Sequence, residues 1–311
     1  MYNLTQLHSF AEAVKGGSLS AAARALGLTQ PAVSQHIHAL EKRAKQTLLV
    51  RLRGGVQTTD AGDIMYHHAQ RVLLEIAQME DQLNALSGVI SGAFKFTASE
   101  VMSQTVAAEL FTRLRQRAPE LTVNLIPSDK VLDVEAEQID LALRIGHPGH
   151  GGGIVRRIGD SAGVLVAAPD YLDRLGRPED LSELIKLDYV QYREAPDQSE
   201  MSLIDADGRS VTAQVKPAFA AHSPSLMLHA LKQGLGFAQV PLFAAGQMID
   251  EGSLVRVLSQ YHCPPKAIYI VQAKSKLNTL ANRLACSTLL EVLTAQQGIT
   301  LTETARQVEK L

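Results

Sequence analysis

The sequence predicts an α/β protein with a small helical head, one long helix and a large body of alternating strands and helices. Three observations lead to this fold class. Short segments of helical apolar periodicity fill residues 4–44, a heptad pattern occupies 65–90, and strand-like and helix-like segments alternate after Gly92. With 311 residues, of which 46% are hydrophobic and 20% charged, the composition is that of a globular chain long enough for two domains.

The head is expected to contain three helices. The first covers residues 4–14, where five apolar side chains share one face. Ser20 is the expected N-cap of a short second helix, and Gly27 supplies the tight turn after it. Thr29 is the expected cap of the next helix, which has Pro31 in its first turn. Two short helices joined by a tight turn predict a helix–turn–helix.

Charge and residue type indicate what the head binds. Residues 1–58 hold seven basic and two acidic side chains, a net charge of +5, and the remainder of the chain carries −7. The expected third helix leaves Gln and Ser side chains on its polar faces, and such side chains hydrogen-bond to base edges in the major groove. The alternative is a helical hairpin whose polar face is merely solvated.

Residues 48–62 add a second structural feature, because two arginines stand just before a Gly-Gly turn between strand-like segments. Such a hairpin is typical of a wing that reaches phosphate or the minor groove. The head is therefore predicted to be a winged helix–turn–helix that binds double-stranded DNA. The candidate DNA-binding residues are Ser20, Thr29, Gln30, Pro31, Ser34, Gln35, His38, Lys42, Arg51 and Arg53.

The long helix carries apolar residues spaced alternately by four and three. A heptad stripe of this kind needs a partner helix, so we expect a homodimer or a dimer of dimers. The alternative is an amphipathic helix that lies on its own domain. The candidate dimerisation residues are Met65, Val72, Ile76, Met79, Leu83 and Leu86.

The body after Gly92 is expected to form an open α/β sheet, which binds ligands outside the carboxyl ends of its strands. Strands are predicted over 93–99, 121–128, 139–146, 163–168, 187–192 and 266–273, and helices over 104–120 and 223–236.

The run LGLTQPAVSQHIHALE, the wing, the segment TTDAG and the long helix together resemble the LysR-type transcriptional regulators. The resemblance continues through APELTVNL, IDLALRIG, LVAAPDYL, GLGFAQVP and GSLVRVL. It implies a periplasmic-binding-protein-like effector domain in which two α/β lobes, joined by two crossover strands, hold a small molecule. One departure is that Gln35 and His36 follow Ser34, where many family members carry a basic residue.

The resemblance also implies domain boundaries. We expect a DNA-binding domain over 1–59, a linker helix over 60–91 and an effector-binding domain over 92–311. Within the last domain, lobe I is expected at about 92–161 and 268–298, and lobe II at about 162–267.

Polar residues at predicted strand ends and at one helix start are the candidates for effector binding. The helix that begins after Ser223 suits a carboxylate, because helix N-termini carry unpaired N–H groups and partial positive charge. Glu100 would repel a carboxylate unless it pairs with Arg144, so the effector could instead carry an amine that Glu100 recognises. Each candidate serine hydroxyl could instead be a plain helix cap. The candidate effector-binding residues are Ser99, Glu100, Met102, Ser128, Arg144, His147, His222 and Ser223.

Other function classes have less support. The sequence has no G-x-x-x-x-G-K-[ST] and no H-E-x-x-H, so we expect neither an enzyme nor a cofactor or metal site. The pair His147 and His150 is more typical of a glycine-rich loop than of a metal site. No apolar run of about 20 residues and no secretion signal are present, which predicts a cytoplasmic protein with Cys263 and Cys286 as free thiols. The alternative function is a small-molecule-binding protein or degenerate enzyme without a transcriptional role.

Overall fold

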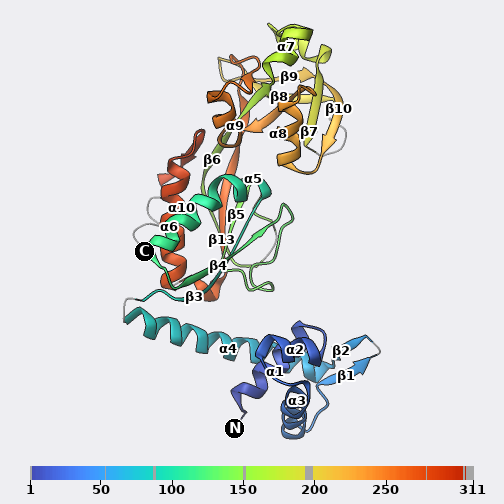
Figure 1. Cartoon of the computed structure of the whole chain (residues 1–311), viewed down its shortest axis with the longest axis vertical. Helices are drawn as coiled ribbons and strands as arrows, with labels where there is room; N and C mark the ends of the chain where they lie inside the picture. Colours follow the sequence, from blue (N-terminus) through green and yellow to red (C-terminus); the bar gives the residue numbers. More distant parts are fainter. Residues whose placement is uncertain are drawn as a thin grey trace. The chain divides into compact units, whose positions relative to one another are not determined.

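The structure is a computed structural model that describes residues 2–52, 54–86, 89–149, 152–192, 199–277, 279–303 and 305 (Figure 1). Arg53 and His150, both named above as candidates, lie outside these ranges. The chain divides into two compact units, Met1–Leu83 and Asn84–Leu311. Among the described residues, no helix is both long enough and apolar enough to cross a membrane.

The first unit contains three helices, a two-stranded hairpin and most of a long fourth helix. Its elements are α1 (Leu4–Lys15), α2 (Leu19–Leu26), α3 (Gln30–Ala44), β1 (Leu49–Leu52), β2 (Gly55–Thr58) and α4 (Asp60–Leu86). The antiparallel pair β1–β2 is the predicted wing.

The helix–turn–helix follows from local capping. Thr29 is the N-cap of α3, as predicted, and its hydroxyl accepts a hydrogen bond from the Ala32 amide. Gly27 adopts the left-handed conformation with φ 63° that ends α2, a conformation that favours glycine. The prediction that Ser20 caps α2 is wrong. Ser18 has the extended backbone of a cap, and its Oγ accepts from the Ala21 amide at 3.1 Å.

One apolar core holds the first unit together. Phe10 from α1, Val33 and Leu40 from α3 and Ala69 from α4 all belong to it. The wing is attached at its base, because the Leu48 amide just before β1 donates to a carboxylate oxygen of Glu41 at 2.9 Å. Helix α3, the wing and the first turns of α4 therefore share one close-packed core.

The second unit contains all the remaining elements. Its helices are α5 (Glu100–Met102), the π-helix η1 (Ser103–Ala107), α6 (Ala108–Arg117), α7 (Pro169–Leu175), η2 (Leu181–Lys186), α8 (Pro224–Lys232), α9 (Leu242–Asp250), η3 (Lys274–Lys276) and α10 (Leu280–Thr294). Its strands are β3 (Gly92–Ala98), β4 (Leu121–Pro127), β5 (Leu141–Ile145), β6 (Ile154–Ala167), β7 (Asp188–Tyr192), β8 (Glu200–Ile204), β9 (Ser210–Gln214), β10 (Lys216–Ala221), β11 (Phe237–Pro241), β12 (Val255–Arg256), β13 (Cys263–Gln272) and β14 (Ile299–Leu301).

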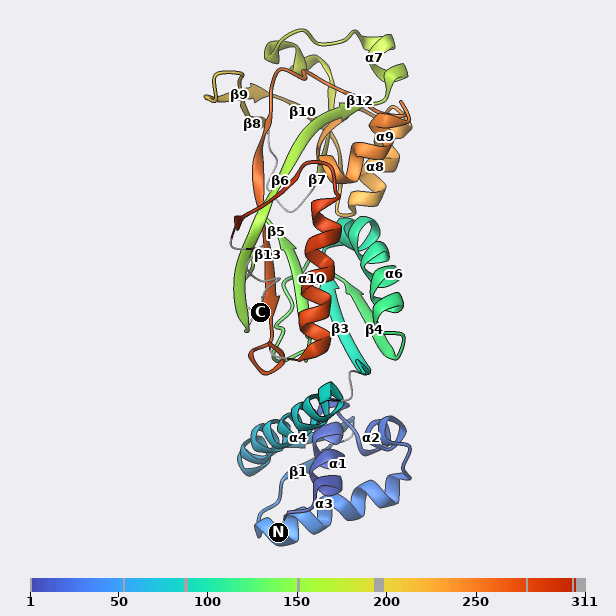
Figure 2. The ribbon, with the colours of Figure 1, turned by 90° about the vertical axis from the view of Figure 1, so that its left-hand side faces the viewer.

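The sheet of this unit runs through two lobes. Its strand order is β10-β7-β11-β6-β13-β5-β3-β4, and β12 and β14 also pair with β6. Strands β3, β4 and β5 are parallel in lobe I, and β7 and β10 are parallel in lobe II. The long antiparallel strands β6 and β13 pass side by side through both lobes (Figure 2). They are the two crossover strands that the family resemblance implies.

Two main cores flank this sheet. The larger core includes Phe96, Leu110 and Leu289 of β3, α6 and α10 in lobe I, and it continues into lobe II through residues of α8 and β11 such as Met227 and Val240. In lobe II, a second core gathers around Tyr171, Leu203 and other buried residues of α7, β7 and β8. The carboxyl ends of β3 and β4, where Ser99 and Ser128 follow, lead toward the start of α5 and a loop. This arrangement places the polar candidates at one edge of lobe I.

Candidate DNA-binding face and effector pocket

Helix α3 presents the predicted polar face. Gln30, Gln35, His38 and Lys42 are exposed, and Ser34 is half-exposed, while the opposite face of the helix packs into the core. Thr29 and Pro31 are exposed at its N-terminus. Gln, Ser and Lys side chains on one open helix face are the groups that contact base edges and phosphates.

The wing meets this face directly. The Arg51 guanidinium on β1 donates from Nη2 to Ser34 Oγ at 3.0 Å. His36 is tied to α1, because its Nδ1 lies 2.7 Å from the Oγ of the buried Ser9. Ser20 is exposed on α2 and so remains available to DNA even though it does not cap the helix.

The apolar stripe of α4 divides into two parts. Met65 is half-buried and packs with Ala69 on the core of the first unit, and its assignment to a dimer contact stays a prediction. Farther along, Val72 is exposed, Met79 is 53% exposed and Leu83 is 58% exposed. Ile76 is half-buried, and the side chain of Leu86 lies outside the described residues.

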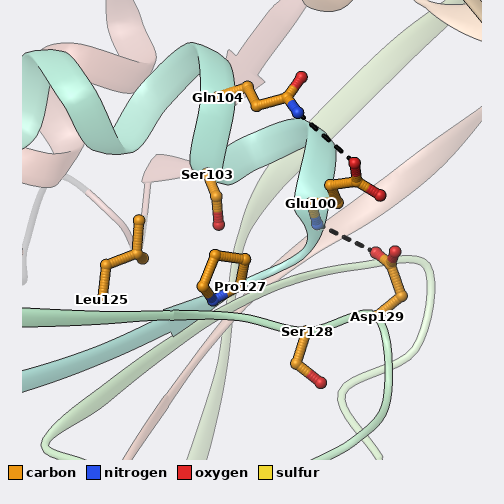
Figure 3. A pocket seen from close by; sticks show the side chains of 7 residues that line it. All are labelled: Glu100, Ser103, Gln104, Leu125, Pro127, Ser128 and Asp129. Atoms are coloured by element: carbon orange, nitrogen blue, oxygen red, sulfur yellow. Dashed lines mark hydrogen bonds between the residues drawn. The ribbon is translucent and has the colours of Figure 1, made fainter. Parts of the chain in front are cut away.

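A cavity of about 480 Å³ opens beside the start of α5 (Figure 3). Apolar side chains from β4 form one part of its wall, and two carboxylates and an amide form another. Its lining residues are Glu100, Ser103, Gln104, Leu125, Pro127, Ser128 and Asp129. Glu100 and Ser128 were predicted, and the structure brings them to the same cavity.

Arg144 lies behind the cavity wall rather than in its lining. Its Nη1 donates to the Ser128 carbonyl oxygen at 2.7 Å, and its side chain is nearly enclosed, with 4% of the residue surface exposed. Burial lowers the pKa of Arg144, and the charge of Asp129 partly offsets that effect. Its Nη2 is buried without a hydrogen-bond partner among the described residues.

Glu100 takes different partners from the predicted one. Its Oε1 accepts hydrogen bonds from Ser223 Oγ and Ser225 Oγ, each at 3.0 Å, and from Gln104 Nε2 at 3.5 Å. Its backbone amide donates to Asp129 Oδ1 at 3.1 Å. The expected pairing with Arg144 is therefore replaced by a set of neutral donors.

The other effector candidates have separate positions. Ser99 and Ser223 are the N-caps of α5 and α8. His222 and His147 are exposed, and His147 Nδ1 accepts from the Gly149 amide at 2.8 Å. Met102 is 0% exposed, belongs to the apolar core and is not among the residues that line the cavity, and its assignment to the effector site stays a prediction.

Several residues of this region were not predicted from the sequence, although the spacing of two of them could have indicated their position. Gln104 stands four residues after Glu100, a spacing that places two side chains on one helix face. Ser225 stands two residues after Ser223 in the first turn of α8. Asp129, by contrast, reaches Glu100 only through the pairing of β3 with β4, which no local pattern indicates.

Residues 159–163, Gly-Asp-Ser-Ala-Gly, match the G-x-S-x-G pattern of some hydrolases. A catalytic serine of that kind sits exposed on a sharp turn between a strand and a helix. Here Ser161 lies inside β6, paired with Lys266 and Ile299, and is 3% exposed. The match is therefore part of a crossover strand and not a nucleophile elbow.

Comparison with known proteins decides the family. Residues 4–63 match the family described as "Bacterial regulatory helix-turn-helix protein, lysR family", and residues 87–294 match the "LysR substrate binding domain". The chain is 31% identical over 278 residues to the HTH-type transcriptional activator AaeR of Escherichia coli strain K12, covering 89% of this chain and 90% of AaeR. The chain belongs to the LysR family of transcriptional regulators.

Solved LysR-type structures agree with this assignment. The structure of CrgA from Neisseria meningitidis is 26% identical, has a TM-score of 0.59 and covers 94% of this chain and 99% of that one. Full-length LysG from Corynebacterium glutamicum, solved with bound effector Arg, has a TM-score of 0.58 at 20% identity, covers 93% of this chain and 97% of its own, and shows the shared fold. This chain is thus a DNA-binding transcriptional regulator with a C-terminal effector-binding domain.

Proposed function

We propose that this LysR-type regulator reads its DNA site through α3 and the wing. The observation that carries the proposal is the exposed polar face of α3 beside Arg51. Gln30, Ser34 and Gln35 contact base edges, and Lys42 and Arg51 contact phosphate or the minor groove. Among the described residues of the first unit, this face combines exposed amides and hydroxyls with a neighbouring arginine.

The functional form is a homodimer, which can associate further into a dimer of dimers. Val72, Met79 and Leu83 supply the support, since three large apolar side chains on one helix face favour a second helix as cover. A symmetric dimer presents two copies of α3 to a symmetric DNA site. DNA as the target places the protein in the cytoplasm, with regulation rather than catalysis as its role.

The effector site is the cavity beside Glu100 and Ser128, at the edge of lobe I that faces α8. Leu125 and Pro127 offer apolar contact, and Gln104 and the two carboxylates offer polar contact. The cavity is of a size that holds a small organic molecule. Binding there alters how the lobes pack and, through α4, the spacing of the two heads, which requires that the effector bind the two states with different affinity.

Selection of bound duplexes from a random DNA pool by the purified full-length protein tests the proposed reading of DNA. We expect recovery of an interrupted inverted repeat, with half-sites of the same sequence. The matched control is a Gln30→Ala, Ser34→Ala double variant, which should enrich no such repeat. Recovery of the same repeat by both proteins would show that these side chains do not read the bases.

A further inference from the structure

Glu100 lies at a junction between the two lobes. It belongs to α5 in lobe I, whereas Ser223 and Ser225 belong to the start of α8 in lobe II. Its Oε1 accepts from both serine hydroxyls at 3.0 Å. The Glu100 carboxylate, together with the hydrogen bond from Gln104 Nε2 to Ser225 Oγ, therefore joins the two lobes at the edge where the cavity opens.

The donors of this junction are fully used. Ser223 Oγ accepts from the Leu226 amide as the cap of α8, so its hydroxyl hydrogen is directed to Glu100. Ser225 Oγ accepts from Gln104 Nε2, so its hydrogen is likewise directed to Glu100. A hydroxyl has only one hydrogen to donate, and an incoming ligand cannot take these bonds while Glu100 holds them.

Helix α8 also attracts the Glu100 carboxylate electrostatically. The N-terminus of α8 carries partial positive charge, and a carboxylate placed there is stabilised. Glu100 thus occupies the position that we expected an acidic effector to take. The cavity lining contains Glu100 and Asp129 but no Lys, Arg or His, and Arg144 is held behind the wall by the Ser128 carbonyl.

We propose that Glu100 is an internal ligand of α8 that bridges the two lobes and sets the charge selectivity of the effector cavity. While the bridge is closed, a free carboxylate meets two like charges, and the Ser223 and Ser225 hydroxyls are already directed to Glu100, so neutral or cationic molecules are favoured. An acidic effector binds only by displacing Glu100, which releases the bridge. This inference rests on the proposed effector site, but the bridge itself can be tested without any effector or DNA.

The first test measures the distance between the lobes in the full-length protein. Spin labels are attached at Arg115→Cys in lobe I and Lys232→Cys in lobe II, both exposed positions. Glu100→Ala should broaden the distance distribution toward longer values, and Glu120→Ala, an exposed acid of lobe I, should leave it unchanged. An unchanged distribution in Glu100→Ala would overturn the bridge.

Two further variants separate a lost bridge from a damaged fold. Ser225→Ala removes one donor on lobe II and should shift the distribution in the same direction by a smaller amount. Glu100→Gln keeps an acceptor oxygen but loses the charge, and should lie between wild type and Glu100→Ala. Opposite or absent shifts in both variants would contradict the proposal.

The second test measures charge selectivity with three probes of one shape, namely benzoate, benzamide and benzylamine. In titration calorimetry, Glu100→Gln should bind benzoate about tenfold more tightly than Glu120→Gln does, because one like charge is removed. Benzamide should bind both variants equally, and benzylamine should bind Glu100→Gln more weakly. Equal benzoate affinity, or no benzoate binding by either variant, would refute the selectivity. The DNA selection described above reports on the regulator function separately.

Discussion

The guanidinium of Arg51 lies 3.0 Å from the hydroxyl oxygen of Ser34, so the wing and the recognition helix form one continuous surface. Arg51 lies on β1 and Ser34 on α3, and both elements are anchored in the apolar core of the first unit through their neighbours Leu49 and Val33. The pair connects a residue expected to contact the DNA backbone with one expected to read a base. Changes at either residue are therefore expected to influence the other.

Replacement of Arg51 by Ala should weaken binding to every duplex. The side chain is exposed and cationic, and loss of one phosphate contact should lower the slope of log affinity against log salt by about one. Fluorescence anisotropy at several salt concentrations measures both quantities, with Arg115→Ala in the second unit as the control. An unchanged slope would remove Arg51 from the DNA interface.

Replacement of Ser34 by Ala should act on sequence preference instead. We expect a loss of roughly 1–3 kcal/mol for the selected site at one base pair, with little change for unrelated DNA. Because Ser34 and Arg51 are hydrogen-bonded, the double variant should depart from additivity. Competition binding with single-base variants of the site measures both the loss of sequence preference and the departure from additivity. Equal losses on all sequences would show that Ser34 reads no base.

Placing charge on the exposed stripe of α4 should dissociate the dimer. Met79→Lys with Leu83→Lys puts two cations on a face that is more than half exposed in the single chain. Analytical ultracentrifugation should then report monomers at concentrations where wild type is dimeric. His67→Lys, an exposed substitution earlier on α4, is the control and should stay dimeric. A dimeric Met79→Lys/Leu83→Lys variant would place the dimer contact elsewhere.

Arg144 supports the wall of the cavity. Arg144→Met removes the hydrogen bond to the Ser128 carbonyl and leaves the charge of Asp129 uncompensated. The free energy of unfolding should fall by about 1–3 kcal/mol in urea denaturation. Adding Asp129→Asn should recover part of this loss, and Arg115→Met should have little effect. A variant as stable as wild type would show that Arg144 has no supporting role.

The two thiols should be unreactive in the folded protein. Burial raises the pKa of Cys263 and of Cys286 to about 12 from an ordinary value of 9.0. At pH 8 a disulfide reagent should therefore modify neither thiol on the time scale that modifies both in urea. The raised thiol pKa stabilises the folded state below pH 9. This stabilisation is lost as pH rises from 9 toward 12, because the thiols of the unfolded chain lose their protons first. Rapid modification of one thiol at pH 8 would contradict the burial.

Local signals predicted the first unit well, because caps and turns act over a few residues. Thr29 and Gly27 have the predicted cap and turn conformations, and α4 begins at Asp60 as expected. Strand β6 was predicted only over 163–168, although it begins at Ile154. Its first half, which crosses between the lobes, carries arginines and an aspartate. A polar run of this kind lacks the apolar pattern by which a strand is predicted from sequence.

The effector region was only partly predictable, since its residues come from distant segments. The strand ends after β3 and β4 indicated Ser99, Glu100 and Ser128, but the contact between Glu100 and α8 depends on how the lobes pack. The burial of Met102 is indicated by the sequence pattern. Met102, Val106, Leu110 and Leu114 recur every four residues and form the buried face of one continuous helical segment.

A symmetric dimer of this chain is proposed to read DNA with two copies of α3. Hydroxyl-radical footprinting of the full-length protein on its selected duplex shows whether both copies bind. We predict two equivalent protected segments on one face of the duplex, with centres separated by a whole number of helical turns of about 34 Å each. A single protected segment, or two segments on opposite faces, would contradict it.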